Sequence, residues 1–178
     1  AVKDLVGRIA ELIKTTGKAE AGDVRVYGPK DYGNATLRLR IKKISVGKFG
    51  WLLDAKAKGA DDSTYKVALG GRLAKGLLPH RGRGIIGVNL DTLNALDAAQ
   101  FPGKGKMMAA FAHVAGGKLL IYRLKEFTGN GTDAPATGLF VGHKNANTGA
   151  TRIRVLGKWD IGNTPTTAQE SNFARLGF

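Results

Sequence analysis

From Asp23 onward the chain consists of short apolar or alternating segments, each closed by glycine, asparagine or aspartate. Alternation with a period of two is the pattern of a half-buried strand, and the small polar clusters are typical of turns. We predict strands within 23–27, 35–45, 48–58, 64–69, 84–90, 118–127, 137–143 and 151–161. Such closely spaced strands favour an α+β, mainly β chain of antiparallel strands, barrel-like or sandwich-like. The sequence does not fix the strand order, so an open sheet stays an alternative.

Two segments have helical periodicity instead. Within 1–17, apolar residues recur at spacings of three and four, and Gly17 follows as a stop signal, which predicts an N-terminal amphipathic helix. A second, shorter helix is predicted over 91–101, with Asp91 as its N-cap and Pro102 at its end. The segment 105–117 fits a buried strand or a helix, because periodicity alone does not separate them.

Nothing in the sequence marks a domain boundary, and 178 residues can bury a core without disulfides. We therefore expect a single domain over 1–178, with the helix in 1–17, a strand-rich core over 23–161 and a polar C-terminal tail over 162–178. The tail ends in Leu and Phe, as an arm that docks on a partner would. The blocks 47–71 and 117–142 share a hairpin pattern, which an internal duplication or general hairpin chemistry would both produce.

Charge indicates the kind of partner. The chain has 28 Lys and Arg against 14 Asp and Glu, a net charge of +14, which favours nucleic acid and, less strongly, an anionic membrane surface. No segment approaches about eighteen consecutive apolar residues, and no signal-peptide pattern occurs, so we expect an intracellular protein of the cytoplasm or nucleoid, or a virion component. Since the chain has no cysteine, disulfides and thiolate metal sites are excluded.

In three predicted strands, two or three cations share one side: Arg38, Arg40 and Lys42, then Arg123 and Lys125, then Arg152 and Arg154. In 35–45, Leu37, Leu39 and Ile41 alternate with Arg38, Arg40 and Lys42, so we expect these cations on a solvent face where they repel one another until a polyanion binds. Solubilising surface charge is the alternative explanation for each strand. With the basic glycine-containing loops, the predicted nucleic-acid contacts are Arg38, Arg40, Lys42, Lys43, Arg81, Arg83, Lys104, Lys106, Arg123, Lys125, Arg152 and Arg154.

Four aromatic residues are candidate platforms for stacking bases: Phe49 and Trp51, which share one face of their strand, Tyr122 beside Arg123, and Trp159 beside Lys158. For each of them a place in the core is the favoured interpretation. No aromatic RNP motif, GXXG loop or zinc finger occurs. The sequence therefore predicts binding to phosphates without reading of bases.

A catalytic function has one candidate site. Asp31, Asp54 and Lys56 fit the loose spacing of magnesium-dependent nucleases, in which carboxylates hold the metal and a lysine steadies the attacking water. The pattern is short, and no histidine cluster or nucleotide-binding loop accompanies it, so we expect no enzyme, cofactor or metal. The predicted function is a non-enzymatic nucleic-acid-binding protein that forms homo-oligomers. A viral or phage coat protein or nucleoprotein is the alternative, and the nuclease is a lower one.

Overall fold

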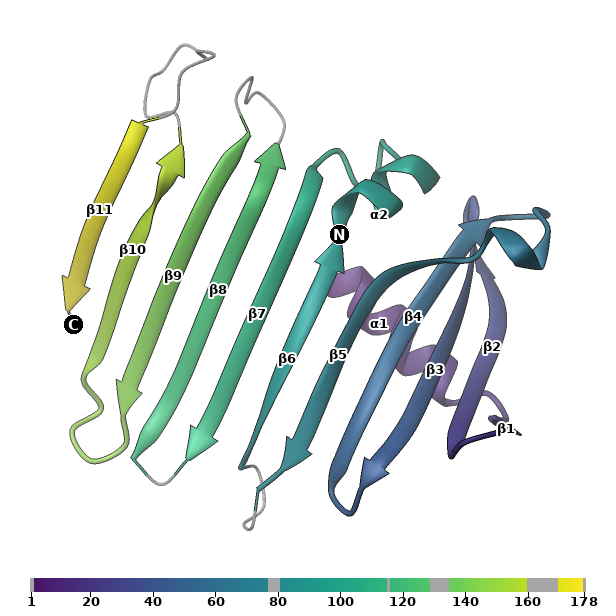
Figure 1. Ribbon diagram of the computed structural model, residues 1–178, viewed down its shortest axis with the longest axis horizontal. Helices are drawn as coiled ribbons and strands as arrows, with labels where there is room; N and C mark the ends of the chain where they lie inside the picture. The colour runs from purple at the N-terminus through teal and green to yellow at the C-terminus, as the bar shows by residue number, and fades with distance from the viewer. Residues whose placement is uncertain (1, 77–80, 115, 129–134, 160–169, 178) are drawn as a thin grey trace.

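The computed structural model describes the backbone of residues 2–76, 81–114, 116–128, 135–159 and 170–177, and the side chains of 7–76, 81–113, 116–128 and 135–157. These residues form one open sheet of eleven strands whose spatial order is the order of the chain (Figure 1). Each strand pairs antiparallel with the next, as the sequence predicts. The strands are β1 (Lys18–Glu20), β2 (Val24–Tyr32), β3 (Ala35–Ser45), β4 (Lys48–Ala57), β5 (Lys66–Lys75), β6 (Gly82–Asn89), β7 (Lys104–Val114), β8 (Gly117–Thr128), β9 (Ala136–Asn145), β10 (Thr151–Trp159) and β11 (Glu170–Gly177).

The N-terminal helix α1 (Val2–Ile13) is confirmed and ends before Gly17. Thr15 donates both its backbone N–H and its hydroxyl to the Leu12 carbonyl, at 2.9 and 2.7 Å, which satisfies a carbonyl that the end of the helix leaves free. The Leu12 side chain is fully buried. The apolar stripe of α1 therefore packs on β2 and β3.

The second helix, α2 (Leu90–Leu96), is shorter than predicted and has a different N-cap. The Asn89 side chain accepts a hydrogen bond from the Thr92 N–H, whereas Asp91 accepts one from the Gly105 N–H at 2.9 Å. Asp91 therefore ties α2 to the beginning of β7, and the ambiguous segment 105–117 is mostly strand. A 3-10 turn, η1 (Asp62–Thr64), lies between β4 and β5.

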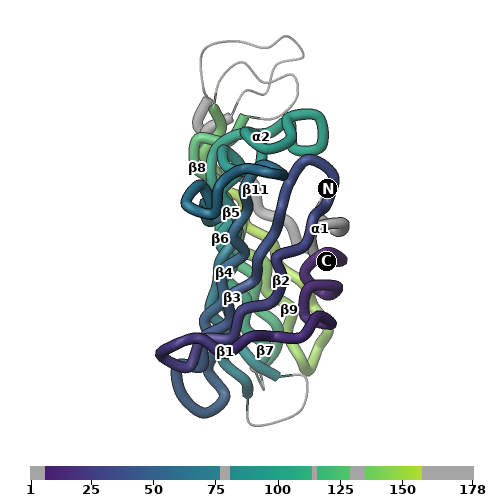
Figure 2. The backbone as a smooth tube through the Cα atoms, turned by 90° about the vertical axis from the view of Figure 1, so that its right-hand side faces the viewer, coloured from purple at the N-terminus to yellow at the C-terminus, as the bar shows by residue number. Residues whose placement is uncertain are grey.

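The buried core lies on one side of the sheet, at its N-terminal half. Leu37, Leu39 and Leu53 of β3 and β4 belong to one cluster with Leu12 of α1 and Leu93 of α2. We call this side the helix-bearing face. In Figure 2, which views the sheet edge-on, α1 lies along this side.

The sheet does not close on itself, so the barrel-like or sandwich-like form predicted from the number of strands is not found within the described residues. β1 and β11 lie at opposite edges of a single layer (Figure 1). Part of the predicted polar tail is a strand, because β11 pairs with β10 along its length. Residues 162–169 of that tail lie outside the described residues.

The two blocks with a shared pattern, 47–71 and 117–142, each contain an antiparallel strand pair, β4–β5 and β8–β9. Neither α1 nor α2, the two helices in the described part of the chain, is long and apolar enough to span a lipid bilayer.

Candidate nucleic-acid interface

The side of the sheet opposite the helices carries most of the predicted cations, and we call it the basic face. Its residues follow from the strand register, which aligns side chains in rows across the sheet. One row runs Lys42, Gly50, Arg72, Ile85, Ala110, Ile121, Val141 and Arg154. Flanking rows add Lys48, Arg83 and Arg152 on one side and Arg40 and Arg123 on the other. The basic face therefore extends from β3 to β10.

The cations on this face lack acidic partners over most of its length. Between Lys66 and Trp159 the strands contain a single acidic residue, Glu126. Its carboxylate approaches the Lys125 ammonium at 3.9 Å, and both side chains are largely exposed. Among the described side chains, no carboxylate pairs with Lys42, Lys48, Arg72, Arg83, Arg123, Arg152 or Arg154. These charges are available to an external anion.

The basic face is hollowed by a groove of about 490 Å³ that crosses β4 to β8. Its cationic lining comprises Lys48, Arg72 and Arg83, and its apolar floor includes Ile85 and Ile121. A second hollow, bordered by Arg40 and Lys42, shares Arg72 with the first. The two hollows therefore adjoin at Arg72.

Arg72 and Lys48 were not predicted as contacts, and Arg72 was missed for a specific reason. The pair Gly70–Gly71 reads as a turn, so the predicted strand stopped at Leu69. In the structure β5 runs through both glycines to Lys75. A Cβ on Gly70 would lie 2.6 Å from Leu52 Cδ2, and one on Gly71 would collide with the Ile85 carbonyl. Close packing of neighbouring strands, not a turn, requires these glycines.

For Lys48 the sequence did contain a signal. Phe49 and Trp51 share one face of their strand, so Lys48 had to project from the other.

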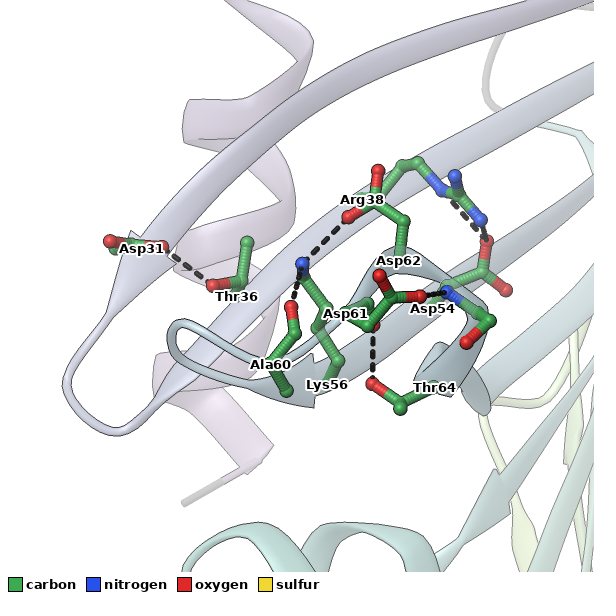
Figure 3. A network of polar contacts seen from close by, with 10 residues as sticks. Asp31, Thr36, Arg38, Asp54, Lys56, Ala60, Asp61, Asp62 and Thr64 are labelled. Carbon is green, nitrogen blue, oxygen red and sulfur yellow. Dashed lines mark hydrogen bonds and ion pairs between the residues drawn. The ribbon is translucent and has the colours of Figure 1, made fainter.

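Two of the predicted contacts, Arg38 and Arg40, are engaged with a buried carboxylate. Asp54 lies directly across from Arg38 in the β3–β4 register, and its side chain is 2% exposed. Arg40 donates two hydrogen bonds to it, Nε to Oδ2 at 2.6 Å and a terminal nitrogen to Oδ1 at 2.7 Å. Arg38 Nε approaches Oδ2 at 3.3 Å (Figure 3). The prediction that the three cations repel one another on a solvent face is therefore wrong for Arg38 and Arg40. Lys42 is exposed to solvent, as predicted.

Arg38 also stacks on an aromatic ring. Its guanidinium carbon lies 4.1 Å from the centroid of Tyr65, and the Lys56 ammonium lies 5.0 Å from the same centroid. Lys56 donates to the Ala60 carbonyl and to Asp62, each at 2.6 Å, and the hydrogen bond to Asp62 is the main cause of its raised pKa. Burial raises the pKa of Tyr65. This cluster fixes the β4–η1 turn and leaves Arg38 little freedom to meet a ligand.

The two carboxylates of the candidate nuclease site are each engaged with other partners, and they lie on strands that are not neighbours. Asp31 accepts a hydrogen bond from the Thr36 hydroxyl at 2.6 Å (Figure 3) and forms an ion pair with Lys58, while Asp54 is held by the two arginines. β2, which carries Asp31, is separated by β3 from β4, which carries Asp54. Within the searched part of the chain, no group of three His, Cys, Asp or Glu side chains could hold a metal ion.

The other predicted contacts divide between the two sides of the sheet and its ends. Lys106 and Lys125 lie directly opposite each other on the basic face, an unfavourable pair in the free protein. Lys43 pairs with Phe49 and so lies on the helix-bearing face. Arg81 precedes β6 and Lys104 begins β7, so neither belongs to the rows.

The candidate stacking residues whose side chains the structure describes are not on the basic face. Phe49 and Trp51 align with Leu73 and Gly71, and Tyr122 aligns with Ala109, all on the helix-bearing face. The side chain of Trp159 is not among those that the structure describes. Phe49, Trp51 and Tyr122 therefore lie on the opposite side of the sheet from the cations of the basic face.

Comparison with protein families, curated proteins and solved structures finds no match for this chain.

Proposed function

We propose that the protein binds nucleic acid through its phosphates, using the basic face. The observation that carries this proposal is the set of cations across β3 to β10 that have no carboxylate partner among the described side chains. A surface that serves only solubility mixes acidic with basic side chains, whereas strands β5 to β10 contain a single acidic residue, Glu126, in their described part. Phosphates would remove the repulsion between residues such as Lys106 and Lys125.

Recognition of bases is not part of the proposal. Proteins that bind single strands without sequence preference stack bases on aromatic rings set among cations. In this chain Phe49, Trp51 and Tyr122 lie on the helix-bearing face, away from the cations of the basic face. We therefore expect affinity that depends strongly on salt and little on base sequence, and no catalytic step or cofactor.

The test compares two triple variants with equal loss of charge. Arg72→Gln, Arg83→Gln and Arg123→Gln neutralise the basic face, while Lys75→Gln, Lys118→Gln and Lys144→Gln neutralise exposed cations of the opposite face. The slope of log K against log salt should flatten by about two to three units in the first variant and by less than about one in the second. Equal effects of the two variants would refute a face-specific interface.

A coat protein or nucleoprotein is the second candidate function. The observation that favours it is the open sheet, which leaves β1 and β11 unpaired on one side within the described residues. Edge strands of this kind can pair with other copies when charge repulsion is neutralised. Light scattering during titration with nucleic acid separates the two candidates: large particles favour the coat protein, and complexes of one or two copies favour the binding protein. In such an assembly, the sheets of several copies could together make the barrel-like or sandwich-like form that the single chain does not have.

A further inference from the structure

The helix-bearing face is covered only in part. α1 contacts β2 and β3, and α2 contacts β4, β5 and β7. Beyond the helices the same face continues from β7 to β10, and its side chains there are mostly apolar and incompletely buried. They include Phe111, Leu120, Tyr122, Phe140 and Val155. We call this area the uncovered patch.

In the uncovered patch, aromatic rings lie over glycines. A Cβ on Gly84 would lie 2.7 Å from the end of the Phe111 ring, and one on Gly138 would lie 3.2 Å from the Phe140 ring. The Tyr122 and Phe140 rings meet edge to face, with centroids 5.8 Å apart. The charged residues of this face, Lys118 and Lys144, lie at one end of their strands. Such a surface suits packing against a second sheet.

The exposed area of the chain is large for its mass. A compact monomer of 18.8 kDa exposes about 8,300 Å². This chain exposes 11377 Å², so the excess is about 3,000 Å². A standard stable interface needs only about 800 Å² from each partner, so the excess is sufficient for a dimer.

We propose that the uncovered patch is the interface between two copies of this chain, packed sheet on sheet through their helix-bearing faces. For a second copy of this chain, charge selects this side. A second copy also carries a net charge of +14, so contact through the basic face would set cation rows against each other. The uncovered patch is the side on which two such chains can approach without that cost. The dimer presents its two basic faces outward in opposite directions, which goes beyond the proposed function by allowing it to bridge two nucleic-acid segments.

The test uses Leu120→Glu, with Leu156→Glu as the matched control. Both leucines are about equally exposed, at 51% and 44%, but Leu120 lies in the uncovered patch and Leu156 on the basic face. Sedimentation equilibrium without nucleic acid should give twice the chain mass for the wild type and for Leu156→Glu. Leu120→Glu should raise the dimer Kd by about 100-fold or more, because a two-fold interface carries the change twice.

A labelling experiment covers the case in which Leu120→Glu does not fold. The chain has no cysteine, so Leu120→Cys and Leu156→Cys each introduce one thiol. Maleimide should label the first more slowly as protein concentration rises and the second at a constant rate. A wild type that stays monomeric at high concentration, or a dimer that both glutamates weaken equally, overturns the proposal. Because nucleic acid is absent, either result leaves the test of the basic face unaffected.

Discussion

At the scale of single residues, Asp54 has the most consequence for how the sequence should be interpreted. The two arginines that hold it lie 16 and 14 positions earlier in the chain. Only the register of the β3–β4 pair brings them together, and that register depends on a bulge between Lys43 and Ser45. The alternation of Arg38, Arg40 and Lys42 correctly predicted that these side chains share one side of a strand. It did not predict that Asp54 of the neighbouring strand lies beside two of them.

Replacing Arg40 by Gln should therefore destabilise the fold. The change leaves a nearly buried carboxylate with only the longer contact to Arg38, and we expect a loss of about 2 to 4 kcal/mol in the free energy of unfolding. Lys42 is exposed and lies two residues after Arg40, so Lys42→Gln should change the free energy of unfolding by less than about 0.5 kcal/mol. Urea denaturation measures both. If Asp54→Asn in the Arg40→Gln background restores no stability, the account of the pair is wrong.

Asp31 gives a prediction about pH. Its pKa lies below the ordinary aspartate value of 3.8, first because of the hydrogen bond from the Thr36 hydroxyl and then because of Lys58. A carboxyl whose pKa is lowered by folding stabilises the fold above its unfolded pKa, and this contribution is lost as pH falls through the folded pKa. The loss of stability from about pH 5 to about pH 2 should therefore be smaller in Asp31→Asn than in the wild type. Equal acid sensitivity of the two proteins in thermal unfolding would argue against this role.

At the scale of elements, hydrophobic periodicity predicted most strands and α1, and the errors have physical causes. β3 was predicted with its observed bounds, because its alternation is regular. β5 was cut short at Gly70–Gly71, since a sequence does not show whether glycine serves a turn or a close approach of strands. α2 was given the wrong cap because Asp91 and Asn89 are both good capping residues, and a contact with Gly105 decides between them.

The two faces of β3 should respond differently to mutation. Leu37 and Leu39 are 2% and 1% exposed, so changing either to Ala should cost about 2 to 5 kcal/mol of stability. The salt slope of nucleic-acid binding should not change, since these side chains point away from the basic face. Denaturation and binding titrations on the same samples test both statements. A flattened slope in Leu39→Ala would mean that the two faces are not independent.

At the scale of the whole molecule, the antiparallel, mainly β class was predictable and the open form was not. Alternation shows that each strand has two different sides, but it does not show whether the last strand returns to the first. The candidate interface was predictable in outline, since most of the predicted cations lie on one face. Their pairing with Asp54 and the segregation of the aromatics required the register of neighbouring strands.

The distribution of buried residues predicts a gradient of local stability. The fully buried large side chains lie in α1, β3 and β4, whereas in the described part of β8 to β10 the buried residues are glycines. In dilute protein, amide hydrogens of β3 and β4 should exchange at least about tenfold more slowly than those of β9 and β10. Hydrogen exchange followed by mass spectrometry measures this. Uniform protection across the sheet would contradict the gradient.

The strand order has a kinetic consequence. Because every strand pairs with its immediate neighbours in the chain, no pairing within the described sheet waits for a distant segment to arrive. Folding rates fall as contacting residues become more separated in sequence, so a sheet of this order should fold quickly for a β protein of its size. Assembly can begin at β3–β4, where the core is, and extend strand by strand toward β11. As the N-terminal half emerges first during synthesis, it can form its core before the C-terminal strands exist.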